Sequence, residues 1–160
     1  MGIYRIAQVC LNGHCITDAL DANPECGQPF CDKCGAATIT SCPSCGARIR
    51  GDYYTPGLCV VGFGYRVPAY CYACGEPYPW TQRAIEATEE IIQDEDELDD
   101  NQKEKLTSSL PNIISETPQT QVAIIRLKKA MSSAGKFTAD ALRQFAIDFG
   151  CELVKKQLGL

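Results

Sequence analysis

The feature that most constrains this chain is a short turn, Cys-x-x-Cys-Gly, which occurs three times in the first 75 residues. The copies read CDKCG at residues 31–35, CPSCG at 42–46 and CYACG at 71–75. In such a turn two sulfurs converge on one point, and the glycine permits the left-handed backbone that closes the turn. Ten of the eleven cysteines lie in this half of the chain. The concentration of paired thiols favours metal binding.

A fourth pair of donors, Cys10 and His14 in CLNGH, precedes the three turns. Four pairs supply eight ligands, which is enough for two structural, tetrahedral Zn²⁺ ions. The expected ligands are Cys10, His14, Cys31, Cys34, Cys42, Cys45, Cys71 and Cys74. His14 is the only histidine, and Cys15 or Cys26 could take its place as a ligand.

The spacing of the pairs favours a sequential arrangement, in which the first two pairs bind one ion and the last two bind the other. The alternative is the cross-braced arrangement of RING domains, which leave a shorter separation between their second and third pairs. Here seven residues separate Cys34 from Cys42. Among the remaining thiols, Cys15 and Cys26 are expected to be free, and Cys59 to be a small apolar strand residue.

The absence of other sequence signals predicts a cytoplasmic protein. No apolar run approaches the roughly 20 residues that span a bilayer, and the N-terminus lacks the apolar core of a signal peptide. Reducing conditions in the cytoplasm disfavour a disulfide framework, and the odd number of cysteines agrees with that.

The composition divides the chain near Trp80 into a double zinc-ribbon domain, residues 1–80, and a helical domain, residues 81–160. The predicted fold class is a small metal-bound α+β protein with two consecutive zinc ribbons, built of knuckles and short antiparallel hairpins, followed by a small α-helical domain. Alternating residues predict strands near Leu58–Phe63 and Tyr65–Tyr70. The ribbons cannot bury a large core, so metal binding and folding should be one event.

Apolar periodicity predicts four helices in the second half. They are expected over about Thr81–Gln93, Asn101–Leu110 ending at Pro111, Thr120–Ala134, and from Thr138 into LVKKQLGL. The last carries an apolar stripe of Leu142, Phe145, Phe149 and Leu153. We interpret the stripe as the core of a small bundle; docking of a partner or a second copy, and contact with a membrane surface, are the alternatives.

Charge is distributed unevenly along the helical half. Residues 81–100 carry nine acidic side chains and one basic, whereas residues 101–160 carry nine basic and five acidic. A solvated linker or helix cap is the favoured interpretation of the acidic stretch, and an acidic docking element is the alternative.

The segments CLNGH, FCDKCG, CPSCGARIRGDY and YCYACGEPYPWT together resemble an uncharacterised family of bacterial double zinc-ribbon proteins. The resemblance covers the N-terminal half and, more loosely, the helical tail. It implies that the eight donors named above are the metal ligands. It implies no activity, because the family has none assigned.

These features predict a non-catalytic zinc protein that acts as a protein–protein interaction or scaffolding module. Closed, thiolate-rich sites are poor Lewis acids, and with His14 bound to zinc no histidine remains for acid–base chemistry. The expected partner is another protein, a second copy of the chain, or both, bound through the C-terminal helices. A RING-like transfer adaptor is a less favoured reading, since it would require the cross-braced arrangement.

Nucleic-acid binding is the main alternative, because arginines beside aromatic rings can hold single strands by charge and stacking. The residues concerned are Arg48, Arg50 and Arg66 with Tyr53, Tyr54, Phe63, Tyr65 and Tyr72. The chain has a net charge of −5, and residues 1–80 hold five basic and six acidic side chains. This charge balance places nucleic acid behind protein as the expected partner.

Overall fold

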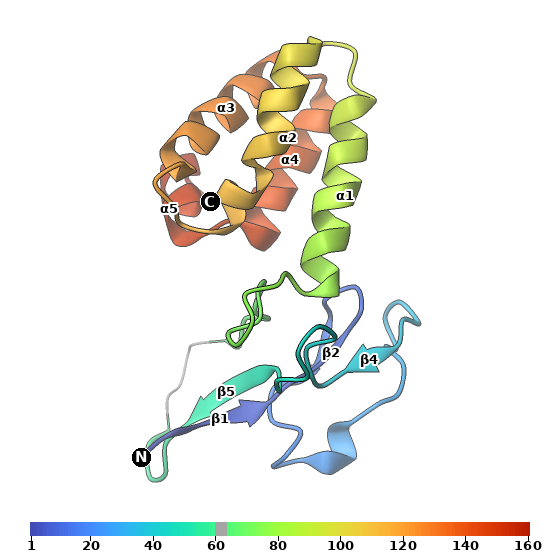
Figure 1. Cartoon of the computed structure of the whole chain (residues 1–160), viewed down its shortest axis with the longest axis vertical. Helices are drawn as coiled ribbons and strands as arrows, with labels where there is room; N and C mark the ends of the chain where they lie inside the picture. The colour runs from blue at the N-terminus through green and yellow to red at the C-terminus, as the bar shows by residue number, and fades with distance from the viewer. Residues whose placement is uncertain (60–63) are drawn as a thin grey trace. The chain divides into compact units, whose positions relative to one another are not determined.

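Strands and knuckle turns occupy the first half of the chain, and helices occupy the second half (Figure 1). The computed structural model describes residues 1–59 and 64–160. It divides into an N-terminal unit, Met1–Gln82, and a helical unit, Arg83–Leu160. The predicted fold class, a small metal-site α+β protein with ribbons followed by helices, is confirmed.

Within the described residues, the N-terminal unit contains two small antiparallel sheets. Their strands are β1 (Ile3–Ile6), β2 (Gln8–Cys10), β3 (Cys15–Thr17), β4 (Thr38–Ile39) and β5 (Arg50–Tyr54), and a 3-10 turn, η1, covers Pro24–Cys26. One sheet has the order β3-β2-β4, and the other pairs β1 with β5. Ile3 lies opposite Tyr54, and Tyr4 lies opposite Tyr53. The first described strand, β1, therefore lies beside the last, β5 (Figure 1).

A close backbone approach fixes the position of β5. The Asp52 N–H donates to the carbonyl oxygen of Asp18 at 2.9 Å. A Cβ atom at Gly51 would overlap that carbonyl group. Only glycine therefore fits at residue 51 without displacing the chain around Asp18.

Among the described residues, the N-terminal unit has a small apolar core. The most deeply buried apolar side chains there, outside the cysteines, are Ala7, Val9, Ile49, Tyr78 and Trp80, each at most 3% exposed. A unit of this size buries a modest fraction of its surface and gains correspondingly little from the hydrophobic effect. Additional cross-links must therefore hold the fold.

The start of helix α1 (Pro79–Gln93) belongs to the N-terminal unit. The Trp80 indole N–H donates to the Pro68 carbonyl at 2.9 Å, and the Thr81 hydroxyl donates to the Ala69 carbonyl at 2.7 Å. The rings of Tyr78 and Trp80 stack with centroids 4.6 Å apart. These contacts attach the first turn of α1 to the segment just before the last cysteine pair.

The helical unit is built of the remainder of α1 and four further helices. These are α2 (Asp100–Ile114), α3 (Thr120–Ser133), α4 (Lys136–Phe149) and α5 (Glu152–Leu158). Helix α2 packs against α3 and α4, and α3 also contacts α4 and α5. Side chains spaced three or four residues apart form the core, including Leu106, Leu110, Ile113, Ile124, Leu127, Leu142, Phe145 and Val154. Over the described ranges, no helix has the length and apolarity that crossing a membrane requires.

The predicted second hairpin is wrong where the structure describes it. Residues 64–69 form no strand, and Tyr70 makes only an isolated bridge to Pro77. The Tyr65 hydroxyl instead donates to the Arg50 carbonyl at 2.7 Å, so this segment meets β5 through a side chain. Most of the strand predicted over Leu58–Phe63 lies outside the described residues, and Cys59 is exposed and not in a strand.

Two predicted helix ends also differ from the structure. Helix α2 continues through Pro111 to Ile114, because the following Ile113 and Ile114 are buried in the core of the unit. The last predicted helix is two helices. The chain leaves α4 after Phe149, and the Cys151 N–H donates to the Ile113 carbonyl at 2.9 Å, outside any helical pattern.

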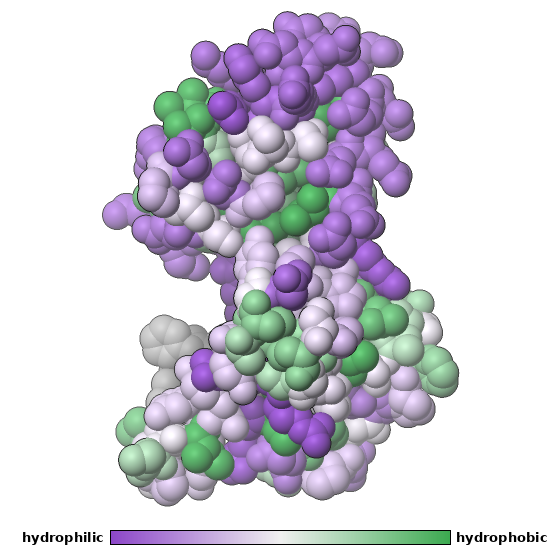
Figure 2. Space-filling model, viewed as in Figure 1, coloured by the Kyte–Doolittle hydropathy of each residue, from purple (hydrophilic) through white to green (hydrophobic). Residues whose placement is uncertain are grey.

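The acidic segment between α1 and α2 caps two helices. The Asp99 carboxylate accepts from the Gln102 N–H at 2.8 Å, and the Gln102 amide oxygen accepts from the Asp99 N–H at 3.0 Å, forming a capping box at the start of α2. Figure 2 shows a hydrophilic surface around this turn. Glu95, by contrast, points inward and is 8% exposed. Its carboxylate accepts from the N–H of Gly135, the residue before α4, at 3.1 Å.

We expect Glu95→Gln to destabilise the helical unit in a pH-dependent way. Hydrogen bonds from the Thr138 side chain and from the N–H groups of Glu97 and Gly135 lower the pKa of Glu95 below its ordinary value. The ionised carboxylate therefore stabilises the fold above the pKa of an unfolded glutamate, about 4.3. This contribution is lost as the pH falls through the lower pKa of the folded state.

Thermal unfolding followed by circular dichroism checks this prediction. The melting temperature of Glu95→Gln should lie below that of the wild type at pH 7, and the difference should shrink below about pH 4. Glu97→Gln is the matched control, because the Glu97 side chain is exposed and only its backbone N–H contacts Glu95. A difference that does not change with pH would contradict the role assigned to the charge.

Candidate metal centres

The three Cys-x-x-Cys-Gly turns have the same backbone geometry. In the first, the Cys31 N–H donates to the Ala36 carbonyl, and the Gly35 N–H donates to the Cys31 carbonyl, both at 2.8 Å. The same two bonds recur at Cys42 and Cys71 at 2.8–2.9 Å. Gly35, Gly46 and Gly75 have φ angles of +72°, +79° and +78°. The predicted left-handed glycines are confirmed, and they let each turn close behind its two sulfurs.

The fourth turn, CLNGH, has a related backbone geometry, although three residues separate its two donors instead of two. The Gly13 N–H donates to the Cys10 carbonyl at 2.9 Å, and Gly13 has a φ of +91°. The Asn12 side-chain amide donates to the Cys34 sulfur at 3.4 Å. Neither contribution was predicted from the sequence, although Asn-Gly is a strong turn signal.

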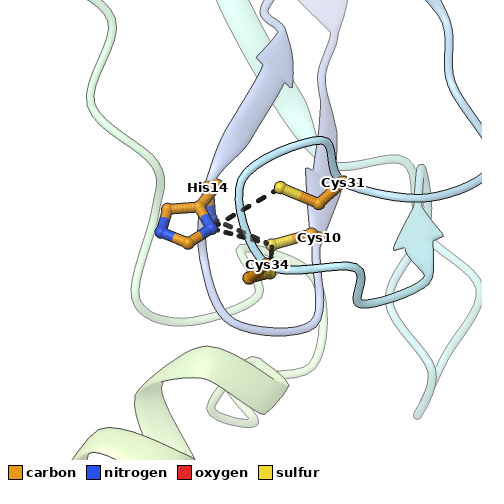
Figure 3. Close-up of side chains that lie close together, drawn as sticks. All are labelled: Cys10, His14, Cys31 and Cys34. Atoms are coloured by element: carbon orange, nitrogen blue, oxygen red, sulfur yellow. Dashed lines mark hydrogen bonds between the residues drawn. The ribbon is translucent and has the colours of Figure 1, made fainter.

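The first cluster brings together Cys10, His14, Cys31 and Cys34 (Figure 3). Their donor atoms all lie within 4.8 Å of one another. The Cys10 and Cys34 sulfurs are 3.7 Å apart, and His14 Nδ1 lies 3.5 Å from the Cys10 sulfur and 3.6 Å from the Cys31 sulfur. Cys10 comes from the end of β2, His14 from the turn into β3, and the other two from the knuckle before β4.

The second cluster brings together Cys42, Cys45, Cys71 and Cys74, again with every sulfur within 4.8 Å of the others. The sulfurs of Cys42 and Cys74 are 3.8 Å apart, and those of Cys45 and Cys71 are 3.7 Å apart. The two clusters group the four pairs sequentially, as the spacing predicts. The cross-braced grouping is not the one in the structure.

The distances within both clusters fit a tetrahedral ion. Bonds of about 2.3 Å to sulfur and about 2.0 Å to nitrogen place two sulfurs about 3.8 Å apart and a sulfur and a nitrogen about 3.5 Å apart. A disulfide would require about 2.05 Å. All eleven cysteines, every one within the described ranges, are free thiols. Both clusters can hold a metal ion, and their soft, thiolate-rich donor sets suit zinc.

Backbone N–H groups lower the pKa of one thiol in each cluster. The N–H of Ala36 and then the Asn12 amide lower the pKa of Cys34 to about 6. The N–H of Cys74 lowers the pKa of Cys71 to about 6 in the same way. Each cluster therefore contains a thiol that is readily ionised, as a metal ligand must be.

Burial differs systematically between the two cysteines of each knuckle. The first cysteine of each, Cys31, Cys42 and Cys71, is at most 4% exposed. The second, Cys34, Cys45 or Cys74, is exposed. Each cluster thus has a protein-facing side and a solvent-facing side.

The remaining thiols lie outside both clusters. Cys15, Cys26 and Cys59 are exposed, and Cys151 is half-buried in the helical unit. His14, and neither Cys15 nor Cys26, completes the first cluster.

Arg48 and Arg50, two of the arginines predicted for nucleic-acid binding, contact different neighbours. The Arg50 guanidinium lies 4.5 Å from the Tyr4 ring centre and 3.7 Å from that of Tyr72. Arg48 donates instead to the Thr40 hydroxyl at 3.3 Å. Arg66 is exposed, and Phe63 lies outside the described residues.

Comparison with known proteins places this architecture in a family. Residues 3–158 match the family described as "Uncharacterized protein conserved in bacteria (DUF2321)". The chain belongs to this family. The match runs through both units, so DUF2321 includes the helices as well as the metal clusters. Searches of curated proteins and of solved structures gave no match.

We expect Cys45→Ser to remove one of two bound metal ions and to unfold the second knuckle pair. Cys59→Ser should retain both ions. Both thiols are exposed, so the two variants differ chiefly in whether the sulfur belongs to a cluster. Native mass spectrometry counts the ions, and limited proteolysis reports the unfolding. Two retained ions with full protease resistance in Cys45→Ser would show that the ligand set is wrong.

We further expect metal removal to unfold the N-terminal unit and leave the helices formed. Trp80, the only tryptophan, is 3% exposed, and its side chain packs against Gly13 of the first cluster's turn. A strong chelator should shift its fluorescence to longer wavelength, as the indole becomes hydrated. The far-ultraviolet circular dichroism of the helices should largely persist. An unchanged emission spectrum after complete metal loss would mean that the unit folds without metal.

Proposed function

We propose that this protein is a non-catalytic zinc protein in which two structural Zn²⁺ ions fold the N-terminal unit and the helical unit binds another protein chain. The observation that carries the proposal is that each cluster presents four protein donors at tetrahedral spacing, and the helical unit has exposed apolar side chains of its own. The first part concerns how the fold is maintained, and the second concerns what the fold does.

The donor sets support a structural rather than a catalytic role for the ions. Catalytic zinc keeps one coordination position for water or substrate, whereas four protein donors fill all four positions. With three or four thiolates per ion, each centre would carry a net charge of −1 or −2 and polarise a substrate poorly. The only histidine, His14, lies inside the first cluster, so it is not available as a general base.

Exposed apolar side chains on the helical unit favour a protein as its partner. Val122 and Ile125 on α3 are 39% and 48% exposed, and Phe137 at the start of α4 is 78% exposed. Val122 and Ile125 line the same groove, and apolar side chains gathered among polar ones are typical of protein interaction sites. The apolar stripe predicted on the last helix is a different set of residues. Two of its members, Leu142 and Phe145, are buried in the core of the helical unit.

Nucleic-acid binding is the second candidate, and one observation favours it. Tyr4, Tyr53, Tyr54 and Tyr72 are all more than 40% exposed, and Arg5 and Arg50 stack on three of their rings. Such rings and guanidinium groups can stack on bases. The same stacking occupies faces of the rings, and residues 1–80 are net negative even before thiolates are counted. These two facts place nucleic acid second.

A RING-like transfer adaptor has less support. That role would require cross-braced pairs, and the clusters combine the pairs sequentially.

Native mass spectrometry of gently purified protein, together with its ratio of absorbance at 260 and 280 nm, tests this proposal. We expect two zinc ions per chain and no bound nucleic acid. Nucleic acid that copurifies and is removed by salt would favour the tyrosine and arginine surface and overturn the choice of partner. Fewer than two ions in fully folded protein would overturn the structural role of zinc.

A further inference from the structure

A groove between α2 and α3 has a basic rim and an apolar wall. Its volume is about 350 Å³, and its lining residues are Asn101, Gln102, Lys105, Val122, Ile125, Arg126, Lys129 and Ala130. We call these residues the basic groove. None of them is acidic, although the chain as a whole has a net charge of −5. The basic groove therefore provides a local positive site on an acidic protein.

The side chains of the basic groove are available for contact. Val122 and Ile125 are exposed in part, whereas Ala130 is 5% exposed. Lys105 and Lys129 are both exposed, and within the described residues neither ammonium group forms an ion pair. Two unpaired cations therefore lie beside two partly exposed branched side chains.

Arg126 is held in place across the groove. Its guanidinium donates to the Ser109 hydroxyl at 2.9 Å and to the Lys105 carbonyl at 3.3 Å. A guanidinium fixed by neutral acceptors keeps its full positive charge and loses little side-chain entropy when an anion binds. The Arg126 guanidinium is therefore already positioned to bind a carboxylate in the groove.

The same helical unit carries an acidic surface on α1. Glu86, Glu89, Glu90, Gln93 and Asp94 line a shallow depression on it. Ala87, Glu90, Ile91 and Asp94 follow one another at spacings of three, one and three residues, so they share one side of the helix. Ala87 is exposed, and Ile91 is half-buried. We call these four residues the acidic face.

Charge therefore separates along the helical part of the sequence in a complementary way. Residues 81–100 have nine acidic and one basic side chain, a net charge of −8, and residues 101–160 have nine basic and five acidic, a net charge of +4. One chain thus provides both an anionic helix with a small apolar residue and a cationic groove with apolar walls.

We propose that the basic groove binds the acidic face of α1 from a second copy of this chain. Glu90 and Asp94 of one copy would meet Lys105 and Lys129 of the other, and Ala87 would pack against Val122 and Ile125. The inference rests on the proposed interaction role of the helical unit and specifies its partner. Because the charged groups are at the surface, the association is weakened by salt.

Sedimentation velocity on the full-length, metal-loaded chain, at low and high salt, tests this proposal. The wild type should associate to at least twice its 17.5 kDa mass, and more weakly at high salt. Lys105→Glu with Lys129→Glu should weaken association about tenfold or more, as should Glu90→Lys with Asp94→Lys. Combining all four substitutions in one chain should restore association, because each interface would again pair opposite charges.

Lys128→Glu with Lys156→Glu is the matched control. It makes the same change in net charge at two exposed lysines outside the basic groove, so it should leave association intact. Circular dichroism confirms that each variant is folded. A wild type that stays monomeric at about 100 μM would overturn the proposal, because a specific self-association of this size should be detectable there. Failure of the fourfold variant to reassociate would also overturn it.

These outcomes are separate from those that test the proposed function. A monomeric, nucleic-acid-free protein with two zinc ions would exclude the second copy as the occupant and leave a different protein as the partner. Copurifying nucleic acid would instead count against the proposed function itself, whatever the mass of the particle.

Discussion

Convergence of four soft donors on one point is the constraint on which the N-terminal unit depends. In the part of this unit that the structure describes, the strands have two to five residues, and few apolar side chains are buried between them. Sheets this short are unstable on their own. In each cluster, donors from segments up to about thirty residues apart lie close enough to bind one ion. A bound ion would therefore cross-link segments that the small apolar core does not stabilise. The sheets then follow from the clusters rather than the reverse.

The knuckles are the part of the structure that the sequence predicts best, because their geometry is local. Two thiols and a glycine within five residues determine the turn, and the spacing between Cys34 and Cys42 was sufficient to favour the sequential grouping. The pairing of β1 with β5 is different. Ile3 and Tyr54 are separated by most of the unit, and nothing in either segment indicates the other. A run of aromatic and branched residues after Tyr54 predicts a local hairpin, but residues 64–69, which the structure describes, form no strand, and the Tyr65 hydroxyl contacts the Arg50 carbonyl instead.

In the helical unit, the periodicity of the apolar residues identifies the helices, while tertiary contacts decide where they end. Pro111 removes one hydrogen bond from α2, and the burial of Ile113 and Ile114 outweighs that loss. The interruption between α4 and α5 after Phe149 depends on a hydrogen bond from the Cys151 N–H to the carbonyl of Ile113, a residue distant in the sequence. The Asp99 and Gln102 capping box follows a local rule, and the acidic stretch is in part the helix cap that its composition indicated.

The unequal burial of the two cysteines in each knuckle has a consequence for the lifetime of the centres. The first sulfur is enclosed by the protein, whereas the second faces water, so reagents can approach a bound ion from one side only. An oxidant or a competing thiol would meet Cys34, Cys45 or Cys74 first, and these positions would begin any exchange or loss of metal. Attack on each centre would therefore begin at its outer sulfur or sulfurs, although all four donors are needed to hold the ion.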